Sequence, residues 1–109
     1  MHFLSIQVQP NLLVNFSAQA IDALRCLDVP TGSVESVDVQ HGEDEGPYFN
    51  VTFETPDPKI LWPTAREALV RLGLQRAAIA TCTGTRGWDN YVLLHHFDRE
   101  VQKERLGAP

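Results

Sequence analysis

Two adjacent histidines, His95 and His96, are residue types that could bind a metal or act as a general base. They lie in an apolar stretch that favours a β-strand, where neighbouring side chains point to opposite faces of a sheet. The two rings therefore cannot easily share one ion. The chain also has no CxxC or HxxxH ligand spacing. We predict no bound metal, no cofactor, and histidines that serve as hydrogen-bonding groups.

Cys82 could act as a nucleophile if a histidine of the neighbouring strand served as its base. However, Ala78, Ala80 and Cys82 alternate as small apolar residues, which indicates the core-facing side of a strand. A free cysteine in such a place behaves as a small hydrophobe. Cys26 and Cys82 are far apart in sequence and lie in apolar settings, which is typical of reduced thiols in a cytoplasmic protein. We predict a structural Cys82, no catalytic residue and a cytoplasmic location.

Two polar segments have compositions suited to binding another protein. Residues 43–45 form an acidic run that lacks the alternating oxygen ligands and the closing Glu of an EF-hand loop. Residues 86–91 combine Arg, Trp and Tyr, the residue types that dominate binding hot spots. The alternatives are a solvated loop for the first segment and a hairpin in which Trp88 folds back over the sheet for the second. The predicted partner-binding residues are Glu43, Asp44, Glu45, Arg86, Trp88, Asp89 and Tyr91.

The apolar pattern predicts the strands that position these residues. Alternating or continuous apolar residues indicate five strands, at 3–9, 36–40, 49–54, 77–83 and 88–97. Between the second and third strands, residues 41–47 are expected to form a long, acidic hairpin loop. Residues 91–94 are apolar on both faces, which favours a strand in the middle of the sheet.

Two helices are predicted from capping residues followed by apolar residues at helical spacing. The first helix follows Asn15 or Ser17, and the second follows Asp57 with Pro58 at its first position. A proline inside a helix removes one hydrogen bond and costs about 3 kcal/mol. We therefore expect Pro63 to divide the second helix into one short turn and a main part. Gly73 is expected to end it.

The resulting order β-α-β-β-α-β-β predicts an α+β fold of the ferredoxin-like type, with a mainly antiparallel sheet and two helices on one face. A single domain is expected over residues 1–98, followed by a short helical or frayed C-terminal tail over 99–109. The other face of the sheet would be open or covered by a second copy in a homodimer. The residues expected to be buried are Leu4, Ile6, Leu24, Phe53, Leu69, Ile79 and Leu93.

Charge is strongly segregated along the chain, which has a net charge of −5. Residues 26–58 contain eight carboxylates and no Lys or Arg, whereas residues 59–109 contain eight basic residues and five acidic ones. A surface of one sign attracts a partner of the opposite sign. An acidic hairpin repels nucleic acid, whose recognition needs a basic field. No stretch reaches the ~18 apolar residues of a membrane span.

These observations favour a small, acidic, non-catalytic protein-interaction or regulatory module that binds a partner with a basic surface. Inhibition of that partner is suggested only by analogy with immunity proteins that neutralise basic nuclease toxins. The alternative is a small enzyme or small-molecule-binding protein with a pocket on the open sheet face, completed in a homodimer. We expect neither nucleic acid nor membrane among its partners.

Overall fold

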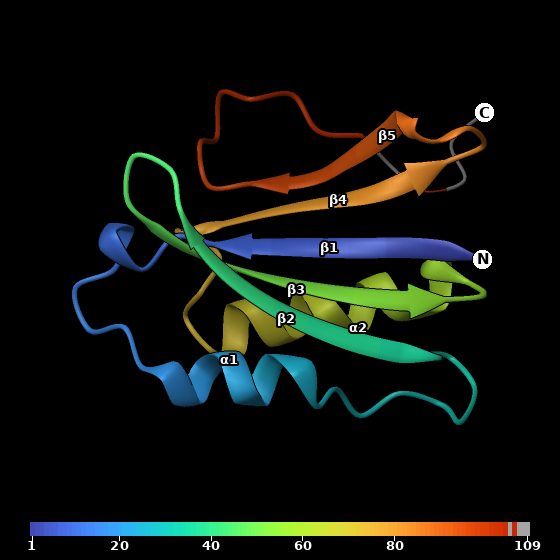
Figure 1. Cartoon of the computed structure of the whole chain (residues 1–109), viewed down its shortest axis with the longest axis horizontal. Helices are drawn as coiled ribbons and strands as arrows, with labels where there is room; N and C mark the ends of the chain where they lie inside the picture. The colour runs from blue at the N-terminus through green and yellow to red at the C-terminus, as the bar shows by residue number, and fades with distance from the viewer. Residues whose placement is uncertain (105, 107–109) are drawn as a thin grey trace.

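Five strands form one antiparallel sheet in the order β2-β3-β1-β4-β5, and two helices accompany it (Figure 1). The computed structural model describes residues 1–104 and 106. The strands are β1 (His2–Val8), β2 (Ser36–Glu43), β3 (Pro47–Thr55), β4 (Ala78–Gly84) and β5 (Gly87–His96). The helices are α1 (Ala18–Arg25) and α2 (Pro58–Arg71), with a short 3-10 turn at Pro10–Leu12. The predicted α+β class, with an antiparallel sheet and two helices, is confirmed. The ferredoxin-like assignment stays a prediction.

Side-chain alternation in β1 determines which face of the sheet is buried. Leu4, Ile6 and Val8 are completely buried, whereas Ser5 and Gln7 between them point to the opposite face. The register carries this pattern across the sheet, because residues paired in neighbouring antiparallel strands lie on the same face. The inward partners of these β1 residues are Phe49, Val51, Phe53, Ala78, Ala80 and Cys82.

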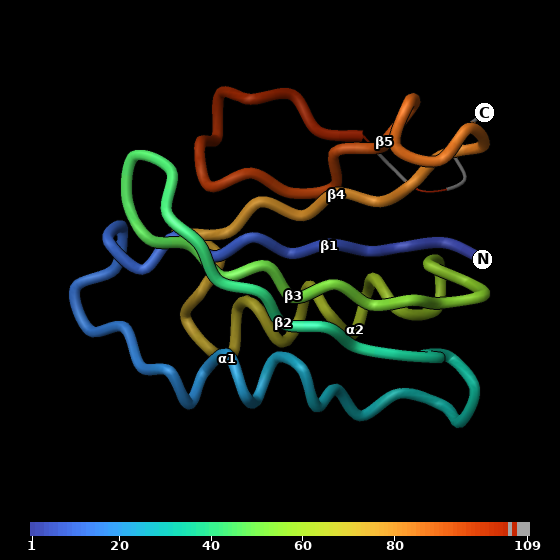
Figure 2. Tube along the Cα trace, in the orientation of Figure 1, coloured from blue at the N-terminus to red at the C-terminus, as the bar shows by residue number. Residues whose placement is uncertain are grey.

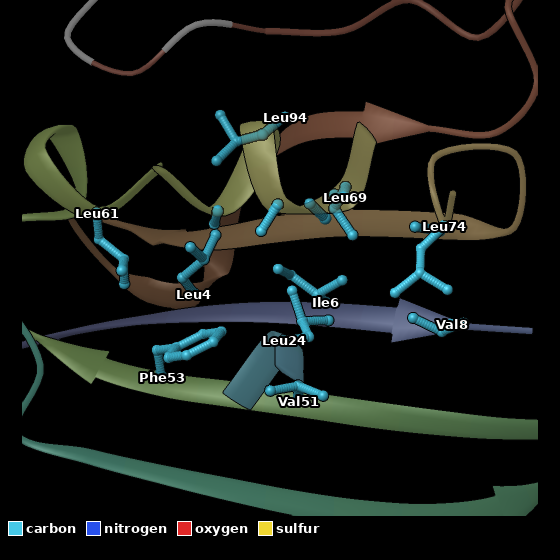
Figure 3. Packing of buried hydrophobic residues seen from close by; sticks show 14 of the residues in the cluster. Leu4, Ile6, Val8, Leu24, Val51, Phe53, Leu61, Leu69, Leu74 and Leu94 are labelled. Carbon is cyan, nitrogen blue, oxygen red and sulfur yellow. The ribbon is translucent and has the colours of Figure 1, made fainter. Parts of the chain in front are cut away.

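Both helices lie on the face of the sheet that carries these aliphatic side chains (Figure 1). Leu24 of α1 and Leu69 of α2 point into the core between the helices and β1 (Figure 3). Five of the residues predicted to be buried are buried: Leu4, Ile6, Leu24, Phe53 and Leu69.

The predicted N-caps are confirmed. Ser17 Oγ accepts a hydrogen bond from Gln19 N at 3.2 Å, and Asp57 Oδ1 accepts one from Lys59 N at 3.0 Å. These bonds satisfy backbone donors that a helix leaves free in its first turn. Gly73 has φ of 70°, and Leu74 N donates to Leu69 O at 2.8 Å, so α2 ends in a glycine C-cap.

The predicted interruption at Pro63 is wrong, because α2 is continuous from Pro58 to Arg71. Pro63 lies in the second turn of the helix and is exposed, as is Lys59 four residues earlier. Pro63 cannot donate to the carbonyl of Lys59, and since both residues are exposed, water can supply the missing donor.

The acidic hairpin is tighter than the predicted loop over residues 41–47. β2 and β3 remain paired up to Glu43 and Pro47, which leaves only residues 44–46 as the tip. Glu45 and Gly46 both have positive φ, and Asp44 N donates to Gly46 O at 2.9 Å. Gly42 makes the extension possible, since the ring of its partner Tyr48 occupies the space where a Cβ would lie.

Ile79 and Leu93 were predicted to be buried, and both are only partly so. Inward-facing Ala78 and Ala80 place Ile79 on the opposite face, where Leu93 pairs with Thr81. The prediction that residues 91–94 lie in the middle of the sheet is also wrong, because β5 is the last strand. The apolar character of β5 has another cause: Leu94 is buried beside α2 (Figure 3).

After β5 the chain turns and returns along the outer edge of that strand (Figure 2). Glu104 N donates to Leu93 O at 2.7 Å, and Leu93 N donates to Glu104 Oε1 at 3.3 Å. Residues 99–104 form a turn and an extended segment with no helix. The rest of the predicted tail, apart from Leu106, lies outside the described residues. None of the described helices is long and apolar enough to cross a bilayer.

Candidate functional site

The face of the sheet opposite the helices, here called the open face, carries mainly hydroxyl, amide and carboxylate side chains. It is built by alternation, because every strand that sends an aliphatic residue into the core sends the next one outward. Hydroxyls of Ser5 and Thr52 lie 3.3 Å apart across the β1–β3 pair, and Gln9 Nε2 donates to Gln7 Oε1 at 3.0 Å. The open face includes Phe3, Ser5, Gln7, Gln9, Ser36, Asp38, Gln40, Tyr48, Asn50, Thr52, Glu54, Ile79, Thr81 and Leu93.

Three adjacent hollows run along the open face. The first, at the acidic tip, has a volume of about 390 Å³ and is lined by Asp44, Glu45, Gly46 and neighbouring amide side chains. The second and third have volumes of about 340 Å³ each. The second is lined by Ser5, Gln7, Asn50, Ile79, Thr81 and Trp88. The third is lined by Phe3, Ser36, Asp38, Gln40, Thr52, Glu54 and Trp88. Gln7 and Asn50 line both the first and the second hollow, so the floor is continuous from the tip to the centre of the sheet.

Trp88 joins the second hollow to the third, because it lines both. Its position follows from an irregularity in the last hairpin. Between the pairs Cys82–Val92 and Gly84–Gly87, one residue of β4 faces four residues of β5. Such a bulge redirects side chains out of the regular pleat. Trp88 keeps 48% of its surface exposed, so much of the side chain remains available for contact with a ligand.

The turn below Trp88 is held by Asn90. Its Oδ1 accepts a hydrogen bond from Arg86 N at 2.7 Å, and its Nδ2 donates to Thr85 Oγ1 at 2.9 Å. Gly84 is required here, since a Cβ at that position would lie 2.1 Å from the Asn90 carbonyl oxygen. The bulge that carries Trp88 is therefore fixed at its base.

The charges lining the three hollows have one sign. They are the carboxylates of Asp38, Asp44, Glu45 and Glu54, and none of the described lining residues is Lys, Arg or His. Glu54 Oε1 accepts a hydrogen bond from Ser36 Oγ at 3.2 Å, which fixes one of the four. A concave acidic surface with a neutral floor attracts cationic groups.

The predicted partner-binding residues lie at two ends of the sheet, and only some of them line the hollows. The acidic tip and the β4–β5 turn lie at opposite ends of the sheet (Figure 1). Asp44, Glu45 and Trp88 line the hollows, whereas Glu43, Arg86, Asp89 and Tyr91 are exposed and line none of the three. Trp88 thus lies beside residues of the open face, and its part in partner binding stays a prediction.

The amide residues of the floor were not predicted as site residues. Gln7, Gln9 and Asn50 gave a signal in the sequence, because they occupy the outward positions of alternating strands. Alternation identifies the face of a strand, but it does not show that the face is hollowed. Tyr48 was not predicted as a site residue either, and it directly follows the loop that was expected over residues 41–47.

The residues with catalytic potential lie away from the hollows. Cys82 is completely buried under the helices, and burial raises the pKa of its thiol, while the Thr83 side chain acts in the opposite direction through a hydrogen bond. The neutral thiol is therefore favoured, and it is the thiolate that reacts. His95 Nε2 lies 2.8 Å from Gln75 O, and His96 Nδ1 accepts a hydrogen bond from Asp98 N. Among the described residues, no group of three His, Cys, Asp or Glu could hold a metal ion.

Comparison with protein-family models, with curated proteins and with solved structures gives no match.

Proposed function

We propose that this protein is a non-catalytic interaction module whose open face binds a basic segment of a protein partner. One observation carries the proposal: the three connected hollows contain four carboxylates, a floor of neutral hydrogen-bonding groups and Trp88, with no Lys or Arg among the described lining residues. Carboxylates and amide oxygens accept hydrogen bonds from Lys and Arg, and an indole face binds a cation through its π-system. The proposed surface keeps Asp44, Glu45 and Trp88 of the predicted partner-binding residues and adds Asp38, Glu54 and the neutral floor.

The length of the surface favours a peptide segment over a single side chain. Asp44 and Glu45 lie at one end of the sheet, and Trp88 and Glu54 line the hollow farthest from them. A ligand that reaches both ends has to be extended. Complementary charge would accelerate association and contribute specificity more than affinity. In an inhibitory, immunity-type form of this role, the acidic face would cover a basic cleft of the partner.

The test is titration with octalysine, followed through the indole N–H signals of the two tryptophans by NMR. The Trp88 signal is expected to shift, and the Trp62 signal, from the helix side, is expected to stay. A variant with Asp38→Asn, Asp44→Asn and Glu45→Gln should bind at least about tenfold more weakly at low ionic strength. The difference should shrink at 0.15 M salt, where the Debye length is about 8 Å.

A matched control removes the same number of charges elsewhere. Asp22, Glu67 and Glu100 are exposed and line none of the three hollows. The variant Asp22→Asn, Glu67→Gln, Glu100→Gln should bind octalysine nearly as well as the unchanged chain. If both triple variants lost the same affinity for octalysine, the loss would be due to net charge alone. The open face would then not be the binding surface.

A small-molecule-binding role is the second candidate, and the hollows themselves favour it, since each is large enough for a compact polar ligand. The affinity for spermine distinguishes the peptide-binding role from the small-molecule-binding role. If spermine binds as tightly as octalysine, the site takes a small polycation and not a peptide segment. The homodimer and the absence of nucleic-acid and membrane partners remain predictions.

We also propose that the architecture is ferredoxin-like with one strand added. Two features support this finer assignment: each β-α-β connection passes over one intervening strand, and both helices lie on one face. β5 is then the additional strand, and its hairpin supplies Trp88 to the open face.

A further inference from the structure

On the helix side of the sheet, a cleft lies between α2 and the returning C-terminal segment. This feature, here called the C-terminal cleft, has a volume of about 610 Å³. Small-molecule sites commonly measure about 300–1,000 Å³. It shares no lining residue with the three hollows of the open face. Its lining residues are Lys59, Trp62, Pro63, Arg66, Leu94, Lys103, Glu104 and Leu106.

Both walls of the C-terminal cleft are held in place. Lys59, Trp62, Pro63 and Arg66 follow one another at helical spacing, so they form one stripe along α2. The opposite wall is fastened to β5 by the two hydrogen bonds between Glu104 and Leu93. These bonds tie the C-terminal wall to the strand that also carries Leu94.

The cleft combines an apolar interior with a positive rim. Trp62 and Leu106 are partly buried against the core, and Leu94 is buried beside them. Lys59, Arg66 and Lys103 contribute three positive charges against the single carboxylate of Glu104.

That carboxylate accepts the hydrogen bond from Leu93 N, so one of its oxygens is turned toward the backbone. Lys103 Nζ donates to Val101 O at 3.1 Å, while Lys59 and Arg66 side chains take part in no hydrogen bond among the described residues. The cleft is thus a positive site on a chain whose net charge is −5.

We propose that the C-terminal cleft binds a small apolar carboxylic acid, with its ring or short acyl chain against Trp62 and Leu106 and its carboxylate at Arg66 and Lys103. Arg and carboxylate groups match in geometry and can form two parallel hydrogen bonds. Trp62 offers a flat surface of the kind that packs against a ring. The apolar body supplies burial, and the two cations select for the acid over its neutral relatives.

The experiment uses 3-phenylpropionate as the probe, with 3-phenylpropanol and phenyl phosphate as comparison ligands, in titrations monitored by NMR. The chain contains two tryptophans, one in each proposed site, and Trp88→Phe assigns their indole signals. We expect 3-phenylpropionate to shift the Trp62 signal and leave the Trp88 signal unchanged. The alcohol should bind at least about tenfold more weakly, since a hydrogen bond to a charged group contributes about 1.5–3 kcal/mol and 1.4 kcal/mol is tenfold in affinity.

The variants Arg66→Gln and Lys103→Gln change exposed residues and should leave the fold intact. Each is expected to weaken 3-phenylpropionate binding by about tenfold. Arg71→Gln is the matched control, because Arg71 is exposed on the same helix and does not line the cleft. An equal loss in Arg71→Gln, equal binding of the alcohol, or a shift confined to Trp88 would overturn the proposal. Tighter binding of phenyl phosphate would overturn the assignment to a carboxylate.

Discussion

Neighbouring residues of β3 have opposite surroundings: Phe53 lies in the core, 1% exposed, and Thr52 lies on the open face. The helix-covered face is aliphatic and filled by side chains of α1 and α2, whereas the open face carries hydrogen-bonding groups and hollows. The comparison teaches that one alternating pattern can supply a folding surface and a binding surface at once. Stability should depend on the first face, and binding of a basic segment should depend on the second.

Replacement of Phe53 by Ala should give the largest effect. Buried Phe→Ala substitutions cost about 3–5 kcal/mol, because they remove apolar contacts and leave a cavity. Thr52→Ala, one residue away, should cost about 1 kcal/mol or less, since it loses only a partly exposed hydroxyl contact with Ser5. Chemical denaturation of both variants measures the difference. Similar costs would mean that the open face is packed as tightly as the covered one.

Two glycines sharpen the comparison between rigid and adjustable parts of the open face. Gly84→Ala should cost about 1–3 kcal/mol, because its Cβ would meet the backbone carbonyl of Asn90. Gly42→Ala should cost less, since its Cβ would meet the movable ring of Tyr48. Thermal unfolding of the two variants measures which of them is less stable. Gly84→Ala should also shift the Trp88 indole signal, and an unchanged signal would show that the turn does not position Trp88.

The reactivity of the two cysteines tests the burial of the covered face, and the expected effect on stability is the smallest of those predicted here. Exposed Cys26 should react with iodoacetamide in the native protein, and buried Cys82 only after unfolding, as read by mass spectrometry.

Because burial raises the pKa of Cys82, its ionisation favours the unfolded chain. The free energy of unfolding should therefore fall as pH rises above the ordinary thiol pKa of 9.0, and Cys82→Ala should remove that part of the fall. Rapid labelling of native Cys82 would contradict its burial.

Local signals in the sequence were sufficient for most of the elements. Ser17 and Asp57 marked the helix starts, and alternation in β1 gave the correct inward residues. The errors arose where a longer-range contact decides the outcome. Pro63 lies on the exposed side of a continuous α2, and the apolar β5 is the last strand, where Leu94 is buried beside α2.

The candidate site was only partly predictable for the same reason. Trp88 and the acidic tip were recognised by residue type, but their placement depends on strand register and on a four-residue bulge. Ile79 illustrates the limit: an isoleucine between two alanines favours the core by hydropathy, yet the smaller residues face inward beneath the helices. The excess of basic residues over 59–109 was visible in the sequence, but the cleft that gathers some of them was not, since its lining residues come from three separate segments.

The pairing of Glu104 with Leu93 has a consequence for assembly. Sheet edges are where separate chains join, and a partner strand approaching β5 would first have to displace Glu104 from both backbone groups of Leu93. The edge of β2 carries no such fastening among the described residues. Two copies that met through β2 would form a closed, two-fold pair with a C-terminal segment guarding each outer end, and growth would stop at two. In such a pair, the return of the chain past β5 would favour a closed dimer over a growing fibre.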